Sequence, residues 1–238
     1  MRLNKLPIQV LDHGFVRLIE PWGKGEGKFP DYERGIIEAA RQSTQGKFRG
    51  WRTDRKLLST LYTGKHATPF EFAGMVVEVR APIAVVREWH RHRTQAYNEM
   101  SARYAPLPDL KYTPSLDRLL EVNTPDRNKQ AGNVGGVELT PARAMSWLRL
   151  LEQAYTASEI AYRYGLKMGI AKEIARLPMP VGQYTQMRCQ ASLRNWLAFL
   201  TLRMDPRAQK EIRLYANAVG QIIEHTFPQT WALFQEQP

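Results

Sequence analysis

The sequence predicts an α+β fold in one domain, residues 1–238, built from a small antiparallel sheet and long helices. Short apolar stretches rich in valine stand early in the chain, whereas apolar residues recur at helical spacing through the second half. The chain lacks the regular alternation of strand and helix that is typical of a doubly wound parallel sheet. At 238 residues it is long enough to bury its own core.

The early part of the chain predicts an edge hairpin, two short helices and a third strand. The hairpin turns at His13-Gly14 and ends in a glycine-rich turn, and the second helix starts behind Asp54 as its cap. Residues 72–80 alternate and are rich in valine, which favours a strand. The other expected ranges are 8–11 and 15–19 for the hairpin strands, 22–27 for the turn, and 31–41 and 54–62 for the helices.

Prolines mark the helices that follow. Pro82 fits the first turn of a helix that runs to about Arg93, and Thr140-Pro141 is a cap followed by proline at the first helical position. Between them, residues 106–139 hold four prolines and predict a surface insertion. The later elements are expected to be a helix to about Tyr164 that Gly165 interrupts, a stretch to Arg176, a helix that ends near Arg203, and a last helix from Asp205-Pro206.

The charge of the chain is unusual. Lysine and arginine total 34 against 23 aspartate and glutamate, a formal net charge of +11. This balance implies anionic partners, and both nucleic acid and small phosphorylated ligands satisfy it. A single cysteine excludes a disulfide scaffold and a thiol-rich metal site. With no apolar run long enough to span a membrane and no signal-peptide pattern, we expect a soluble cytoplasmic protein.

A short basic segment is the first candidate for a functional site. Residues 87–93 read REWHRHR, and Arg103 follows ten residues later. Arginine carries a planar, permanently charged fork of donors that suits phosphate and carboxylate groups. A solvated basic face or a nucleic-acid stripe would give the same cluster. The interleaved polar residues favour a pocket that holds an anion and also reads a polar ring; they are Asn98, Glu99, Ser101 and Tyr104.

Other chemistries have weaker support. His90 and His92 lie two residues apart, so their rings diverge on a helix, and no cysteine or aspartate completes a metal site. Cys189 lacks the sequence context of a nucleophile, and neither a Gly-x-Ser-x-Gly elbow nor a glycine-rich nucleotide loop occurs. Arg194 and Arg203 leave opposite faces of one predicted helix, which would suit two ligands or two subunits, unless each simply reaches solvent.

Residues 91–104 read RHRTQAYNEMSARY. This segment resembles the signature of flavin-dependent thymidylate synthases, Arg-His-Arg-x-x-Ser-x-Asn-Glu-x-Ser-x-Arg-Tyr, and departs from its fixed positions at Ala96, where the family has serine. Three further segments resemble the family in chain order: Ala39 to Arg41 with Ser43, His66 to Glu71, and Ser192 to Arg203. The resemblance covers about residues 39–216.

The resemblance implies a reaction and an assembly. In the family, dUMP is methylated to dTMP, with methylenetetrahydrofolate as the carbon donor, reduced FAD as the hydride donor, and NADPH as the reductant of FAD. It also implies a homotetramer with active sites shared between subunits. We expect no metal, and no nucleic-acid or membrane partner. A basic nucleic-acid-binding protein and an inactive or altered-substrate member of the family are the alternatives.

The resemblance also implies roles for individual residues. Arg203 is the implied catalytic residue, which would lie against the uracil and stabilise its ionised form. The other implied contacts of dUMP are Glu88, Arg91, Glu99, Met100, Ser101, Ala102, Arg103 and Arg176. The implied contacts of FAD are Ser43, His66, Thr68, Glu71, Arg91, His92, Arg93, Glu99, Ser192, Leu193, Arg194 and Ala198.

Four of these neighbourhoods depart from the common pattern of the family. Ser192 stands where asparagine usually precedes Leu-Arg, Ala198 where some members have asparagine, and Phe72 where histidine often follows Pro-Phe-Glu. These changes weaken individual flavin contacts. Glu88 stands where some members have glutamine, and a carboxylate there would repel a phosphate unless a neighbouring arginine neutralises it.

Overall fold

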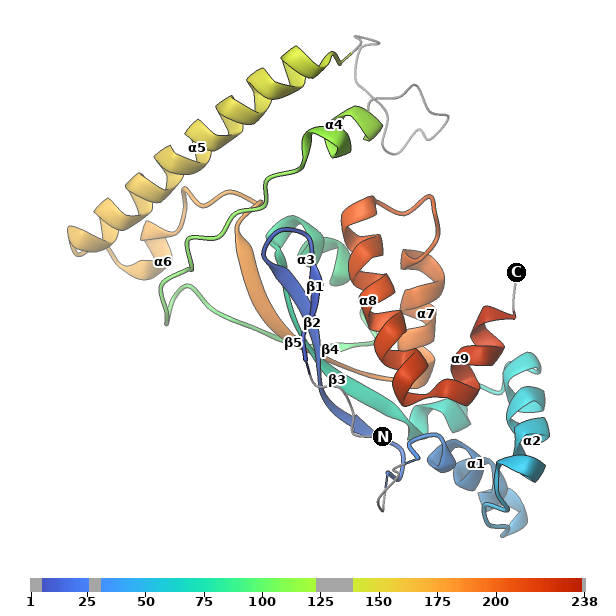
Figure 1. Cartoon of the computed structure of the whole chain (residues 1–238). Helices are drawn as coiled ribbons and strands as arrows, with labels where there is room; N and C mark the ends of the chain where they lie inside the picture. The colour runs from blue at the N-terminus through green and yellow to red at the C-terminus, as the bar shows by residue number, and fades with distance from the viewer. Residues whose placement is uncertain (1–5, 26–30, 123–138, 237–238) are drawn as a thin grey trace.

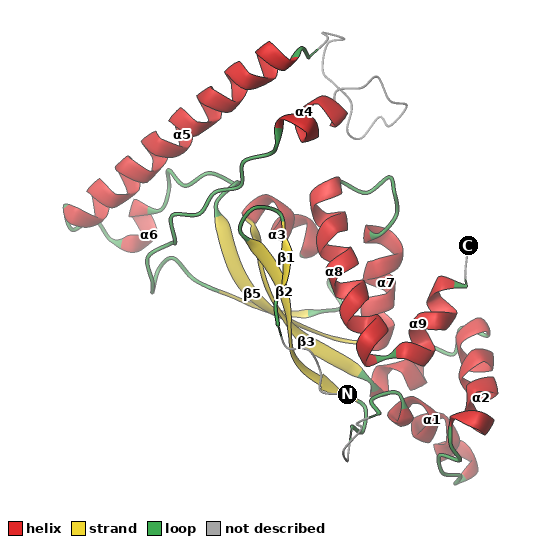
Figure 2. Ribbon diagram, viewed as in Figure 1, coloured by secondary structure: helices red, strands yellow, loops and turns green. Residues whose placement is uncertain are grey.

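One antiparallel sheet forms the centre of the molecule (Figures 1 and 2). The computed structural model describes residues 6–25, 31–122 and 139–236. Its five strands pair in the order β1-β2-β3-β5-β4, and all neighbours are antiparallel. They are β1 (Ile8–Val10), β2 (Gly14–Trp22), β3 (Gly74–Pro82), β4 (Ala96–Glu99) and β5 (Tyr184–Ser192). The predicted α+β class with a small antiparallel sheet is confirmed.

The helices fall into three groups (Figure 1). The pair α7 (Leu193–Arg203) and α8 (Lys210–Thr226), with α3 (Ile83–Trp89), packs on one face of the sheet. A second group gathers at one end of the sheet: α1 (Arg34–Arg41), α2 (Trp51–Thr63) and α9 (Pro228–Gln235). The third group is an arm that projects from the body: α4 (Leu116–Val122), α5 (Pro141–Lys167) and α6 (Lys172–Ala175).

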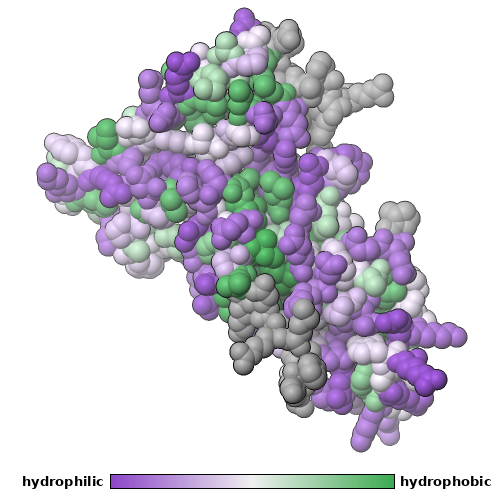
Figure 3. All heavy atoms as spheres, in the orientation of Figure 1, coloured by the Kyte–Doolittle hydropathy of each residue, from purple (hydrophilic) through white to green (hydrophobic). Residues whose placement is uncertain are grey.

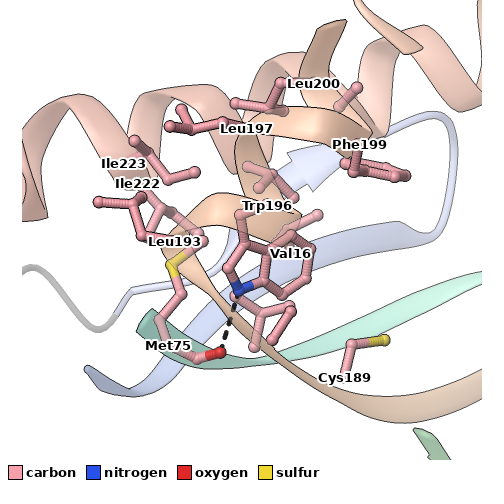
Figure 4. Packing of buried hydrophobic residues seen from close by; sticks show 14 of the residues in the cluster. Val16, Met75, Cys189, Leu193, Trp196, Leu197, Phe199, Leu200, Ile222 and Ile223 are labelled. Atoms are coloured by element: carbon pink, nitrogen blue, oxygen red, sulfur yellow. Dashed lines mark hydrogen bonds between the residues drawn. The ribbon is translucent and has the colours of Figure 1, made fainter. Parts of the chain in front are cut away.

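The alternation of side chains along β3 explains why the sheet has a buried face. Met75, Val77 and Val79 are fully buried in the hydrophobic core, whereas the residues between them face the other side of the sheet. Trp196 of α7 lies over this buried face, and its indole N–H donates to the carbonyl of Met75 at 3.1 Å (Figure 4). The core therefore fixes α7 on the sheet, and with it both ends of that helix.

Several sequence expectations agree with the structure. The edge hairpin turns where predicted, because Val10 pairs with Gly14 at the end of the β1–β2 ladder. Thr140 caps α5 as expected, and its side chain accepts from the backbone N–H of Arg143. The prolines after Arg176 end the helical stretch of the arm. Part of the predicted insertion 106–139 forms α4, and residues 123–138 of the insertion lie outside the described part of the chain. The end of the predicted 22–27 turn lies outside it as well.

Other expectations were wrong. Helix α2 begins at Trp51, so Asp54 lies within its first turn, where it is fully buried and paired with Arg41. Pro82 ends β3 and precedes α3, which ends at Trp89 rather than near Arg93. Gly165 does not interrupt α5, because the helix continues to Lys167 and turns at Gly169, whose φ is +82°.

The end of the chain and the middle of the sheet also differ from the prediction. The last predicted helix is two helices: α8 begins at Lys210, after a turn at Asp205-Pro206, and α9 follows separately. Strand β3 begins at Gly74, because residues 68–72 form a short 3-10 helix. The sequence analysis did not predict strands β4 and β5. Strand β5 lies inside the sheet, between β3 and β4.

Candidate functional site

The segment that carries the family signature is held rigidly between α3 and the sheet. The indole N–H of Trp89 donates to the side-chain oxygen of Gln95 at 3.0 Å, which closes the turn after α3. The hydroxyl of Tyr97 donates to the carbonyl of His92 at 2.7 Å and also contacts the carbonyl of Trp89 at 3.2 Å. Since these contacts fix the inner side of the turn, Arg91 and Arg93 are left exposed to solvent.

A second part of the signature lies along β5. The hydroxyl of Thr185 donates to a carboxylate oxygen of Glu99 at 2.7 Å, and the backbone N–H of Met100 donates to the carbonyl of Gln186 at 2.8 Å. The following turn, Ser101 to Tyr104, ends the ladder, and it places the backbone of Ala102 inside and the Arg103 side chain outside. Thr185 was missed by the sequence analysis because β5 itself was missed.

The arm brings a further arginine to this turn. Lys172 of α6 donates from Nζ to the carbonyl of Tyr104 at 2.9 Å, which ties the arm to the end of the signature. Arg176 follows α6 and is exposed; its Nε donates to the carbonyl of Glu173 at 3.3 Å. Within the described part of the chain, no carboxylate forms an ion pair with the exposed arginines of the signature or with Arg176. These cations are therefore available to an anionic ligand.

Arg203 belongs to a different, half-buried cluster. It is the last residue of α7, and its Nε donates to Nε2 of His92 at 2.9 Å. Its Nη2 donates to the carbonyl of Glu88 at 3.2 Å, and its Nη1 lies 3.6 Å from a carboxylate oxygen of the same residue. Burial raises the pKa of Glu88 although the charge of Arg203 opposes this shift. Burial, together with Arg203, lowers the pKa of His92 to about 4.

Some of the residues expected to hold a flavin lie near the start of α7. Arg194, in its first turn, pairs with Glu71 from the 3-10 helix before β3. Thr68, at the start of that 3-10 helix, lines a hollow of about 570 Å³ together with Gly23, Lys24, Gly35, Glu38, Ala39, Gln42 and Phe72. Ser43, which follows Gln42 in the chain, is exposed, and its hydroxyl donates to the carbonyl of Ala40 at 3.2 Å. His66 is exposed just before the 3-10 helix.

The start of α7 offers a test of whether an anionic cofactor fits. The hydroxyl of Ser192 is buried and has no hydrogen-bond partner in the described part of the chain. A buried polar group without a partner is costly, so a ligand that supplies one would be stabilised there. The N-terminus of an eleven-residue helix adds a favourable field for a diphosphate, and Arg194, which pairs with Glu71, adds a cation. The residues present therefore fit a flavin dinucleotide.

Two of the expected cofactor residues lie differently from their neighbours. The side chain of Leu193 is fully buried in the core, and its N–H donates to the carbonyl of Ala73 at 2.7 Å. Ala198 is exposed one turn further along α7. The structure thus gathers Thr68, Glu71, Ser192 and Arg194 but directs Leu193 into the core.

One chain does not unite all of the predicted residues. Figure 1 shows α6, which precedes Arg176, apart from α7, which ends at Arg203. Arg194 and Arg203 have separate partners at the two ends of α7. The candidate site is therefore three groups of residues. The first is the exposed arginines of the signature segment with Arg176, and the second is the cluster of Glu88, His92 and Arg203. The third is the start of α7 with the 3-10 helix that precedes β3.

The described residues give little support for a cysteine nucleophile or a metal site. Cys189 is buried in the core, and burial raises the pKa of its thiol, which disfavours the reactive thiolate. Among the described residues, no group of three or more histidine, cysteine, aspartate and glutamate side chains could hold a metal ion. His90 and His92 do diverge: one ring packs on Tyr97 and the other on Phe199. Across 6–25, 31–122 and 139–236, no helix is long and apolar enough to cross a membrane.

The fold and these three groups define an α+β protein with exposed arginines at its candidate site. Comparison with known proteins gives the family. Residues 27–229 match the family model Thy1, described as thymidylate synthase complementing protein. A flavin-dependent thymidylate synthase of Thermus thermophilus is 39% identical over 232 residues, which are 97% of this chain and 79% of that protein. The Dictyostelium discoideum protein of the same name is 34% identical over 94% of this chain and 72% of its own length.

A solved structure agrees with the sequence relatives. The UMP/dUMP methylase PolB from Streptomyces cacaoi, bound with 5-Br dUMP, superposes with a TM-score of 0.79 at 29% identity, and the match covers 96% of this chain and 97% of that one. The same methylase bound with 5-Br UMP gives a TM-score of 0.77. The chain belongs to the flavin-dependent thymidylate synthase family, which confirms the resemblance seen in its sequence.

Proposed function

We propose that this chain methylates dUMP to dTMP with a reduced flavin. A methylene carbon from methylenetetrahydrofolate would bond to C5 of the uracil, the C5 proton would leave, and tetrahydrofolate would be released. FAD, when bound and reduced, supplies the hydride that completes the methyl group, and NADPH restores its reduced form. The observation that carries the proposal is the half-buried Arg203 guanidinium, held beside a segment that matches the family signature at all its fixed positions but Ala96.

The nucleotide would be held mainly by arginines. Arg91, Arg103 and Arg176 would bind its phosphate, with the Ser101 hydroxyl and the backbone of Met100 and Ala102. Arg203 would lie against the pyrimidine and stabilise the negative charge that develops on it, since a fixed cation in a partly dry site needs no reorganisation. Glu99 would lie between the nucleotide and the flavin. Glu88 would lie near the nucleotide, because its carboxylate is 3.6 Å from Nη1 of Arg203.

The flavin would bind at the start of α7. Ser192 and Arg194 would face its diphosphate, and Thr68 and Ser43 would line the hollow beside it. Arg91, Arg93 and Glu99 would contact it from the signature segment. His66 and Glu71 would stand near its ring system, and the family's contacts at His92, Leu193 and Ala198 complete the proposed set.

The active sites would be shared within a homotetramer. The arm carries exposed apolar side chains that a second copy of this chain would cover: Met145, Trp147, Leu150, Ile160, Tyr164, Met168, Ile170, Ile174, Leu177 and Val181. Figure 3 shows apolar surface gathered where α4 and α5 meet the grey segment. A large exposed apolar patch marks an interaction site. Arg176 lies on this arm, and in the shared site that we propose it would face a nucleotide held at another chain's Arg203.

Absorption spectroscopy and a turnover assay test the proposal. Flavin bands that bleach under NADPH without oxygen, followed by dTMP formation from dUMP and methylenetetrahydrofolate, are expected; UMP is the comparison substrate, because PolB is a UMP/dUMP methylase. Arg203→Ala is expected to lose turnover while flavin stays bound. Preferential conversion of UMP would reassign the substrate. Absence of flavin binding, together with steeply salt-dependent nucleic-acid binding, would favour the basic nucleic-acid-binding alternative.

Shared sites can be tested separately by complementation. Arg194→Ala and Arg203→Ala variants would each be weakly active, because one damages the cofactor group and the other the substrate group. Unfolding and refolding them together would form mixed tetramers in which some sites draw both intact arginines from different chains. Recovered activity supports sites that draw Arg194 and Arg203 from different chains, whereas no recovery in verified mixed tetramers contradicts that arrangement.

A further inference from the structure

The guanidinium of Arg203 is oriented by neighbours on two other elements. An arginine side chain has five N–H donors in one plane. The Nε donor is taken by Nε2 of His92 at 2.9 Å, and one Nη2 donor by the carbonyl of Glu88 at 3.2 Å. The remaining three N–H groups are on Nη1 and Nη2, at the end of the fork, where Nη1 lies 3.6 Å from a carboxylate oxygen of Glu88 without a hydrogen bond. Whatever fixes the Nε edge therefore decides where these three groups point.

The contact requires a particular state of His92. A ring nitrogen that accepts a hydrogen bond carries no proton, so the imidazole must be neutral with its proton on Nδ1. This is the reverse of the Nε2–H form that a free imidazole favours. The charged groups around the ring are Arg203 from α7 and, beyond it, Glu88 from α3. Burial and the neighbouring cation keep the pKa of His92 near 4, so the accepting state persists at neutral pH.

The ring of His92 is itself held in place. Its backbone carbonyl accepts from the hydroxyl of Tyr97 at 2.7 Å, which anchors the turn to β4. Its ring meets the ring of Phe199 edge to face, with centroids 4.9 Å apart. Phe199 lies one helical turn before Arg203, and it is fully buried in the core. The acceptor is thus fixed to the same rigid helix as the donor.

We infer that His92 is a positioning residue for Arg203: its neutral ring holds the Nε edge of the guanidinium so that the free end of the fork faces the pyrimidine. The part that concerns the pyrimidine rests on the proposed function. The family resemblance places His92 against the flavin instead. With Nε2 taken by Arg203, only the Nδ1–H group is left to contact a cofactor.

Two variants of His92 separate the acceptor from the ring. His92→Phe keeps the packing on Phe199 but removes the acceptor, and His92→Gln keeps an oxygen that can accept from Nε of Arg203. The matched control is His90→Phe, which removes the other imidazole of the same turn; the buried Nε2 of His90 has no partner among the described residues. Each variant is tested as the flavin-loaded protein, with its melting temperature measured to verify the fold.

The expected result is a loss of kcat that the conservative variant recovers. For His92→Phe we expect kcat at saturating FAD to fall about tenfold or more, since the lost interaction acts through Arg203 on the transition state. His92→Gln should recover most of the loss, and His90→Phe should stay near wild type. A loss of FAD affinity in His92→Phe with normal kcat at saturating FAD would overturn the inference, as would a His92→Gln variant no better than His92→Phe.

A spectroscopic readout separates this inference from the proposed function. In protein labelled with ¹⁵N-histidine, His92 should show a protonated Nδ1 and an unprotonated Nε2 at neutral pH. The Nε–H proton of Arg203 should be protected from exchange in wild type and in His92→Gln but not in His92→Phe. If dUMP is not converted but these signals are found, the proposed function fails and the positioning contact stands. A protonated Nε2 on His92 would overturn the inference whatever the activity.

Discussion

A buried carboxylate should make the stability of this protein fall as the pH rises. Glu33 precedes α1 and is 2% exposed, and its two oxygens accept from the backbone N–H groups of Gln229 at 2.9 Å and Thr230 at 2.6 Å. It thereby ties the first turn of α9 to the start of α1. Burial raises the pKa of Glu33 from 4.5 to about 7, although these N–H donors favour the charged form.

The sign follows from the two pKa values. Below 4.5 the carboxyl is protonated in both the folded and the unfolded chain, whereas near neutral pH the unfolded chain releases the proton more readily. Stability is therefore fully present below the unfolded pKa and is lost as the pH rises through about 7. Between about pH 5 and about pH 8 the loss amounts to about 2 to 3 kcal/mol, or roughly 4–12 °C in melting temperature for a domain of this size.

His92 also titrates within this pH range, and its contribution to stability has to be separated from that of Glu33. The lowered pKa of His92 makes stability rise between about 4 and 6.5, the opposite sign. The difference between wild type and Glu33→Gln cancels this term, because both proteins keep His92. The control is Glu38→Gln on α1: Lys24 and Arg34 lower the pKa of the Glu38 carboxylate despite its partial burial, so its window lies at more acid pH.

Thermal melts at fixed protein and flavin concentration, from about pH 5 to about pH 8, measure the effect. Wild type should lose stability relative to Glu33→Gln as the pH rises, and Glu38→Gln should follow wild type. A wild-type minus Glu33→Gln difference that stays constant with pH would refute the reasoning. It would mean that the two backbone donors offset burial and keep Glu33 charged throughout.

Two further substitutions test the packing. Arg41→Met should destabilise the fold by about 3 to 5 kcal/mol, because it leaves the fully buried Asp54 without its cation; adding Asp54→Asn should recover most of this in urea unfolding, and no recovery would contradict the explanation. Gly74→Ala should cost about 1 to 3 kcal/mol, since a Cβ would lie 2.2 Å from the ring of Trp22 and 2.5 Å from the carbonyl oxygen of Ala191. The control is Gly165→Ala, whose Cβ would meet nothing closer than 3.5 Å, so this variant should be as stable as wild type or more stable. Equal melting temperatures for Gly74→Ala and Gly165→Ala would rule out the steric explanation.

The parts of the fold that the sequence predicted are those with a local cause. The Thr140 side chain caps α5 and Pro141 fits its first position, so both signals act within a few residues of the helix start. Likewise, the turn at His13-Gly14 joins two short apolar runs. Strand β5 has no such signal, because TQMRCQAS alternates weakly and owes its extended form to pairing with β3 and β4. The Asp54 error has the same origin: a capping residue and a buried ion-pair partner look alike until Arg41 is placed in space.

The candidate site divides along the same line. The arginines of the signature could be named from the sequence, since charge and spacing are visible there. The grouping of Glu88, His92 and Arg203 could not, because residues 111 positions apart in the chain are joined by one hydrogen bond. That Arg194 and Arg203 would lie on one helix could also be predicted, and the two side chains have separate partners.

The single helix α7 therefore links the two chemistries of the proposed reaction. Ser192 directly precedes it, Arg194 lies in its first turn, and its last residue is Arg203, so the two arginines are roughly 14 Å apart along a helix that rises about 1.5 Å per residue. Trp196 fastens the helix to β3, so this spacing does not adjust within one chain. Groups that react must approach to about 3 to 3.5 Å. A flavin ring must therefore extend along α7 or come from another chain to meet a nucleotide at Arg203, and the complementation experiment decides between these two routes.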